Sequence, residues 1–190
     1  GVSDIWGGVG IWHSRDAAEA MVAAPGDAMP WLEETVTAWH CLSIPISHRG
    51  EVNWRGHVQS GNAVRPAAVD PGGPLIVLTS AGFASRDAAR LPTIKRFVAG
   101  VVEVLDAYGT HAANLRHAAF RAAFGGRDGF TLSLWHSDEG MREAAYHPGA
   151  HRTYVDEDKA GLLSDRTSFT RLRAIDSWGD WDGEVLSSQA

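Results

Sequence analysis

The stretch that decides the fold is 130–183, which begins FTLSLWHS (130–137), continues through the turn YHPGAH (146–151) and ends WGDWDG (178–183). Its alternating apolar start predicts a strand, and polar-capped helical segments are predicted on both sides of the turn. A second strand is predicted at 167–175. The order strand, helix, histidine-bearing turn, helix, strand is typical of half a ferredoxin-like α+β unit.

Part of this stretch occurs twice in the chain. The sequence Trp-His-Ser at 12–14 matches Trp-His-Ser at 135–137, and both copies close on Trp-x-Gly, beginning at Trp54 and Trp181. Matching ends at nearly equal spacing indicate an internal repeat. The copies differ at the turn, because the first copy has no counterpart of His151.

The composition is that of an ordinary globular protein. The chain has 190 residues, of which 44% are hydrophobic and 21% charged. A chain of this length buries on folding roughly 70% of the surface that it exposes when unfolded. The net charge of −6 and the absence of a basic run argue against nucleic acid as a partner. A single cysteine makes the cytoplasm the expected compartment. Eight tryptophans fit either a pocket for a large flat ligand or a tryptophan-rich core.

The pattern predicts two unequal halves. The C-terminal half reads β-α-β-β-α-β and contains the clearest amphipathic helix, from Pro92 to Tyr108, whereas the N-terminal half reads only β-α-β. Free faces of such sheets commonly pack together as a barrel. The predicted fold is therefore α+β, of the ferredoxin-like dimeric α+β barrel type. The predicted boundaries are 1–58 for the incomplete half, 59–73 for a linker, 74–183 for the complete half and 184–190 for a tail.

Within the first half, the predicted elements are a strand at 1–13, a helix from Ser14 to Ala24, a short helix near Pro30 and a strand at 36–46. In the second half, 114–124 is predicted to be a strand with Leu115 and His117 on one face.

His151 is the main candidate for chemistry. Pro148 and Gly149 separate it from His147, so the two histidines do not share a helix and a zinc pair is excluded. A helix starting near His151 places this imidazole in the first turn, either as an axial ligand of a heme or as a solvated capping residue. An axial histidine needs a partner for its other ring nitrogen, which an acid of 156–158 would supply.

Several strand residues are candidates for a pocket. Arg121 and Arg173 would need a buried anion if they point inward, although outward-facing arginine is the usual case. His117 shares a strand face with Arg121. No phosphate loop, nucleophile elbow or dinucleotide fingerprint is present.

These motifs together resemble the spheroidene monooxygenase family of heme proteins. The resemblance rests on WHSDEGM at 135–141, YHPGAHR at 146–152, FTRL at 169–172 and GDWDG at 179–183, with SHRG at 47–50 and WRG at 54–56. More distantly, the second half resembles the heme-dependent aldoxime dehydratases. Relatives of this kind begin with a further strand and helix, so the chain is expected to lack an N-terminal βα pair.

The resemblance implies a heme-dependent monooxygenase that acts on a hydrophobic, carotenoid-like substrate. His151 would be the iron ligand, Trp135 and Tyr146 would contact the heme, and Arg173, Arg121 and His117 would assist cleavage of the O–O bond. A homodimer, an external electron donor and a peripheral membrane contact are expected with it. The alternatives are a heme-dependent dehydratase of aldoxime-type substrates, and a non-catalytic α+β module that dimerises or a cofactor-free oxygenase of the same fold.

Overall fold

The computed structural model describes residues 7–10, 12, 14–24, 37–54, 57–60, 65–85, 87–121, 128–184 and 186. In chain order, the elements are α1 (Arg15–Ala23), β1 (Trp39–Trp54), β2 (His57–Ser60), β3 (Leu75–Gly82), the 3₁₀ helix η3 (Ala88–Arg90), α2 (Leu91–Gly109), β4 (Asn114–Arg121), β5 (Asp128–Trp135), α3 (Asp138–Tyr146), α4 (Ala150–Lys159) and β6 (Arg166–Gly179). None of these helices is long and apolar enough to cross a membrane.

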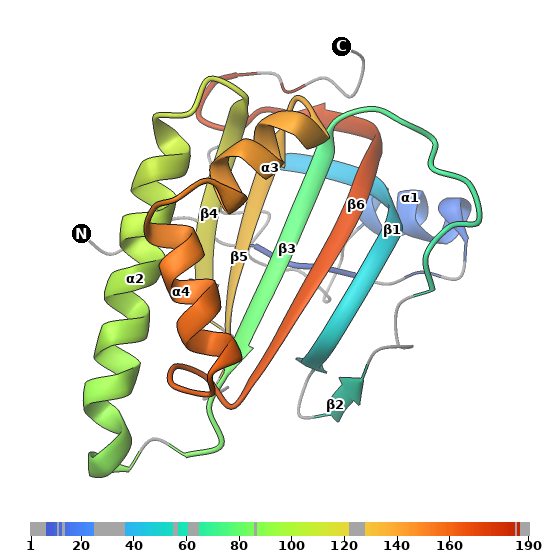
Figure 1. The fold of residues 1–190 in the computed structure, drawn as a ribbon. Helices are drawn as coiled ribbons and strands as arrows, with labels where there is room; N and C mark the ends of the chain where they lie inside the picture. Colours follow the sequence, from blue (N-terminus) through green and yellow to red (C-terminus); the bar gives the residue numbers. More distant parts are fainter. Residues whose placement is uncertain are drawn as a thin grey trace.

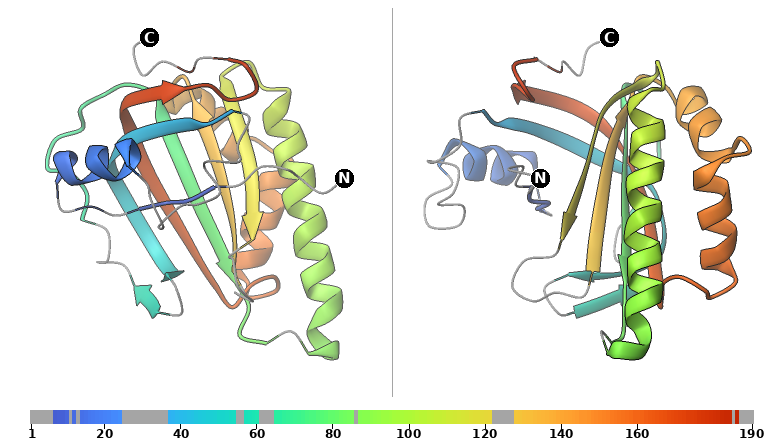
Figure 2. Two further views of the ribbon diagram at one scale, coloured as in Figure 1. Left: turned by 180° about the vertical axis from the view of Figure 1, so that it is seen from behind. Right: turned by 90° about the vertical axis from the view of Figure 1, so that its left-hand side faces the viewer.

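The strands form one antiparallel sheet in the order β2-β1-β6-β3-β5-β4. Within this sheet, the four strands in the order β6-β3-β5-β4 have the ferredoxin-like arrangement of a β-α-β-β-α-β chain. Helices α3 and α4 together take the place of the second helix. The predicted α+β, ferredoxin-like fold is confirmed. Helices α2, α3 and α4 cover one face of the sheet (Figure 1), and α1 lies on the opposite side (Figure 2).

The N-terminal half contributes to the same sheet. Strand β1 pairs with β6 from Trp39 to Gly50, so the incomplete half extends the sheet of the complete half. The predicted helix α1 is present and is capped by Ser14. Residues 7–10 and 12, predicted to belong to a strand, are in none. The short helix predicted near Pro30 lies outside the described residues.

The main core fills the space between the helices and the sheet. Its buried members are Leu75, Tyr108, Trp135, Met141 and Ala145, which come from two strands and two helices. The apolar stripe predicted for α2 supplies Val104 and Leu105 to the same layer. Tyr108 of this core contacts both Trp135 at the end of β5 and His151 at the start of α4.

A β-bulge corrects one detail of the prediction. The register of β4 against β5 shifts between Asn114 and Arg116. Because a shift of one residue moves a side chain to the other face of a sheet, Leu115 packs in the cluster on the opposite face, with Ile76 and Leu134. Leu115 and His117 therefore do not share a face as the alternation predicted.

Candidate active site between the helices and the sheet

A cavity of about 290 Å³ lies where the end of α2, the end of α3 and the start of α4 meet. It is lined by Ala107, Tyr108, His111, Glu143, Ala144, His147, Pro148, Gly149 and His151. Two histidines with different hydrogen-bonding states and one buried tyrosine give this cavity its chemistry.

His151 is held in one tautomer by the turn that precedes it. Helix α3 ends at Tyr146 and α4 begins at Ala150, as the Pro148-Gly149 pair predicted. The ring Nδ1 lies 2.6 Å from the carbonyl oxygen of Ala145. A carbonyl only accepts, so Nδ1 carries the hydrogen and Nε2 of the neutral ring has the free lone pair. Burial lowers the pKa of His151, and the bond to Ala145 opposes this in part.

His111 has the opposite tautomer. It lies in the turn between α2 and β4, where its Nδ1 accepts a hydrogen bond of 3.2 Å from the backbone N–H of Ala113. The hydrogen of the neutral ring is therefore on Nε2, which lies 3.8 Å from Oε2 of Glu143. The cavity thus has an acceptor nitrogen on His151 and a donor nitrogen on His111.

Tyr108 forms a wall of the cavity beside His151. Its ring lies 5.9 Å from the ring of His151 and packs edge-on against Trp135 at 4.9 Å, and Trp135 in turn contacts His111 at 5.7 Å. Trp135 is fully buried, and its indole N–H donates to Ser133 Oγ at 2.8 Å. Burial, reinforced by the nearby Tyr146, raises the pKa of Tyr108, so the phenol stays protonated.

The other predicted site residues lie apart from this cavity. Tyr146 lines a more open groove of about 730 Å³ along α3, and its hydroxyl accepts from Arg171 at 3.2 Å. His117 is bonded to Asn114 Oδ1 at 3.0 Å, and burial lowers its pKa, opposed in part by Asp106. Arg121 ends β4, and its side chain lies outside the described part of the chain.

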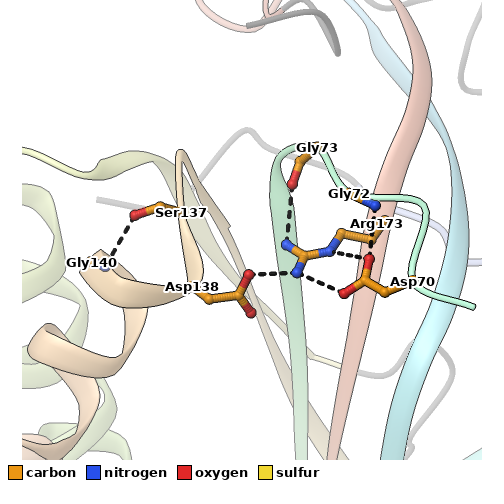
Figure 3. Close-up of polar contacts among 7 residues, drawn as sticks. All are labelled: Asp70, Gly72, Gly73, Ser137, Asp138, Gly140 and Arg173. Carbon is orange, nitrogen blue, oxygen red and sulfur yellow. Dashed lines mark hydrogen bonds and ion pairs between the residues drawn. The ribbon is translucent and has the colours of Figure 1, made fainter.

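Arg173 is bound on several sides by protein groups (Figure 3). Its Nε and Nη2 donate to the two carboxylate oxygens of Asp70 at 2.8 and 2.9 Å, Nη2 also donates to Asp138 at 2.5 Å, and Nη1 donates to the carbonyl of Gly73 at 3.1 Å. The hydrogen bonds to Asp70 are the main reason that its pKa is raised. This guanidinium joins the segment before β3 to the first turn of α3.

The heme prediction is wrong. Trp135 is fully buried beneath Tyr108 and does not line the cavity, so it is not placed to contact a cofactor there. The cavity is at the lower limit of the ~300–1,000 Å³ of ligand pockets. Within the described ranges, no three or more His, Cys, Asp or Glu side chains are placed to hold a metal ion.

The acids predicted to orient His151 have other partners. Asp156 pairs with Arg152, Glu157 with Arg96, and Asp158 accepts from Ser164. A backbone carbonyl takes their place, which a pattern of side chains does not reveal. The sequence reasoning also missed His111 as a site residue, because it shows no ligand spacing with the other histidines. Its position two residues after the Gly109 that ends α2 was the available signal.

Comparisons with known proteins give structural similarity only. A variant of SnoaB, a cofactor-independent oxygenase from Streptomyces nogalater, is 12% identical, covers 60% of this chain and 98% of its own, and has a TM-score of 0.40. A protein from Shewanella oneidensis is 10% identical over 57% and 91% of the two chains, with a TM-score of 0.41. A candidate antibiotic biosynthesis monooxygenase from Bordetella bronchiseptica is 12% identical over 60% and 100%, with a TM-score of 0.31.

No protein-family model and no curated protein matches the chain. The resemblance to spheroidene monooxygenases is therefore not found by these comparisons, and the similar oxygenase SnoaB is described as working without a cofactor.

Proposed function

We propose that this protein is a monooxygenase that uses His151 as a general base on a small, largely apolar substrate, without heme. One observation carries the proposal: the Nδ1–H of His151 is fixed by the carbonyl of Ala145, which leaves Nε2 as the ring nitrogen available to a ligand in the cavity. Burial keeps this imidazole neutral at physiological pH, the state in which it takes up a proton.

The substrate is a molecule with an acidic C–H next to a carbonyl. His151 removes this proton, and the resulting carbanion adds O₂ to give a hydroperoxide after protonation. Loss of water then leaves a new carbonyl, so that R₂CH₂ and O₂ give R₂C=O and H₂O. The substrate supplies all the electrons, and the external electron donor expected for a heme enzyme has no place in this scheme.

His111 and Tyr108 have supporting roles. The Nε2–H of His111 is a donor for the enolate oxygen that develops when the proton leaves. Tyr108 provides an apolar wall against which a flat substrate packs. Several of the similar structures are described as oxygenases, but the proposal depends on the geometry of the two histidines.

Oxygen consumption with 2-tetralone, which has an acidic CH₂ beside a ketone, tests the proposal. We expect His151→Gln to lower kcat by about 10²- to 10⁴-fold, the usual contribution of a general base. His136→Gln replaces an exposed histidine outside the cavity and is the matched control. The rate of the wild type is expected to fall at a pH lower than the ordinary histidine pKa of about 6.5, because burial lowers the pKa of His151. A rate in His151→Gln equal to that of the control would disprove the role of His151.

A further inference from the structure

The face of the sheet opposite α2, α3 and α4 contains buried nitrogens that bond to nothing. Among the described residues, the buried side-chain polar atoms without a hydrogen-bond partner are Trp39 Nε1, His48 Nε2 and Arg166 Nε. All three residues belong to the neighbouring strands β1 and β6. Buried polar groups in native proteins nearly always have a partner, so a group of exceptions requires a physical reason.

His48 is fixed at one ring nitrogen and free at the other. Its Nδ1 lies 2.7 Å from Oγ1 of Thr170, the residue that pairs with it across β1 and β6. Burial lowers the pKa of His48, so the ring is neutral at physiological pH. Nε2 is therefore an uncharged hydrogen-bonding atom with no partner in the protein.

Arg166 has its charge neutralised but keeps an unused donor. Its Nη2 forms an ion pair with Asp128, whose side chain is only 3% exposed. A side chain at Gly82 would collide with this pair, because a Cβ there would lie 1.8 Å from Asp128 Oδ1. The pair therefore lies directly over the backbone of Gly82, and the Nε–H of Arg166 remains without an acceptor.

The two free nitrogens lie on one face. Arg166, Ser168 and Thr170 alternate along β6 and so point to the same side of the sheet, and Thr170 bonds to His48. Arg166 and Thr170 are four steps apart along β6, which is a backbone spacing of about 13 Å. Between them, the hydroxyls of Ser168 and Ser80 are 2.6 Å apart.

The surroundings of this polar line are apolar, and the line itself is buried, with Ser80, Ser168 and Thr170 only 2–4% exposed. Buried Leu78 pairs with Thr170, and Ala118 lies two strands further across the same face. The N-terminal segment reaches this side, where a Cβ at Gly7 would meet the ring of Phe120 at 2.8 Å. The described residues of this segment, 7–10 and 12, are exposed.

We propose that this face is a second small-molecule site, which binds an elongated, uncharged and largely apolar compound with an oxygen at each end. A carbonyl oxygen accepts from the Nε–H of Arg166, and a hydroxyl bonds to Nε2 of His48. The site is separate from the cavity at His151, which lies on the helix-covered side of the sheet.

The charges of the site select a neutral ligand. Asp128 already balances Arg166, and His48 is neutral, so a carboxylate on the ligand would lose its hydration without gaining an unpaired cation. A bicyclic aromatic with oxygens at opposite ends has the required shape and roughly the required length.

Isothermal titration calorimetry with three matched probes tests this inference. The probes are 6-hydroxy-2-acetonaphthone, 6-ethyl-2-naphthol, which lacks only the carbonyl, and 6-hydroxy-2-naphthoate, which carries a charge. We expect the ketone to bind about three- to tenfold more tightly than the ethyl compound, the net effect of one hydrogen bond, and more tightly than the carboxylate. Equal binding of ketone and ethyl compound, or strongest binding of the carboxylate, would overturn the proposal.

Arg166→Lys locates the interaction, because lysine keeps a positive charge beside Asp128 but has no Nε–H. The preference for the ketone is expected to fall to less than twofold in this variant and to persist in His151→Gln. A preference that persists in Arg166→Lys would place the carbonyl elsewhere.

A second measurement on the unmodified chain does not depend on the folding of any Arg166 variant. In protein with labelled histidines, addition of 6-hydroxy-2-acetonaphthone is expected to shift the ring signals of His48 in the NMR spectrum, at the concentrations at which heat is released. A shift of the His151 signals alone would place the compound in the helix-side cavity and overturn the second site.

Discussion

The two copies of Trp-His-Ser begin with the same local structure and end in different environments. In each copy the serine caps a helix: Ser14 Oγ accepts from the N–H of Ala17 at 3.2 Å, and Ser137 Oγ accepts from that of Gly140 at 3.1 Å. However, Trp135 is fully buried, whereas Trp12 is 42% exposed. Local sequence therefore determines the cap, and the neighbouring elements determine burial.

What surrounds each copy explains the difference. The second copy begins at the last residue of β5 and lies beneath α2 and α3, where Tyr108 and His111 pack against Trp135. The first copy precedes α1, on the other side of the sheet, and α1 is joined to β6 by the exposed ion pair of Arg15 with Asp176. The second copy, with helices on top of it, contributes residues to the cavity at His151.

The largest difference is expected between the two tryptophans. Trp135→Ala removes a fully buried indole and should lower the free energy of unfolding by about 3–5 kcal/mol. Trp12→Ala should change it by less than about 0.5 kcal/mol, as is usual at exposed positions. Urea unfolding followed by circular dichroism measures both. Similar losses in the two variants would show that the first copy is buried in solution.

The second largest difference in stability is expected between the ion pairs near the two copies. Arg173→Met leaves Asp138 without its cation and should cost about 2 kcal/mol, less than the ~3–5 kcal/mol of a fully buried pair because Asp70 is half exposed. Arg15→Met removes an exposed pair and should leave the unfolding midpoint unchanged. If added salt lowered the unfolding free energy of the wild type as much as Arg173→Met does, the ion pairs of Arg173 with Asp70 and Asp138 would be ordinary surface pairs.

Removing the helix cap of each copy should give a smaller difference in stability. Ser137→Ala removes the hydrogen bond to Gly140 and should cost about 1 kcal/mol of unfolding free energy, because α3 is part of the core. Ser14→Ala removes an equivalent bond from a helix that buries only Ala18, so its effect on global unfolding should be smaller. Amide hydrogen exchange of the first turn of each helix measures the local effect. Equal global losses would contradict the minor contribution of α1.

The smallest effect concerns the histidine that only the second copy has. The pKa of His151 is lowered in the folded state, so the unfolded chain binds a proton first as pH falls below about 6.5, and stability decreases in that window. His151→Gln should flatten this dependence by a fraction of the ~1.4 kcal/mol per pH unit that a full proton would give.

Part of the dependence should remain in this variant, because burial also lowers the pKa values of His40, His48 and His117. Unfolding at pH 5, 6 and 7, with His136→Gln as the control, provides the comparison. A steeper dependence in His151→Gln would reverse the inferred sign.

Patterns confined to one segment predicted the local structure well. The spacing of three and four from Pro92 to Tyr108 gave α2, and Pro148-Gly149 separated α3 from α4. The resemblance to heme proteins directed attention to His151, which does line a cavity, but the cofactor predicted with it was wrong. Neither the carbonyl of Ala145 nor the ring of His111 is recognisable as its partner from spacing along the chain.

By itself, the sequence determined the secondary structure of the second half, its helix caps and its α+β class, because these depend on side chains a few residues apart. The tertiary structure decided which nitrogen of His151 is free, that Arg173 is bound to Asp70 and Asp138, and that His48 and Arg166 share the other face of the sheet. These contacts join residues that are distant in the chain or involve backbone atoms. The pairing of β1 with β6 brings His48 beside Thr170 on the face that also carries Arg166.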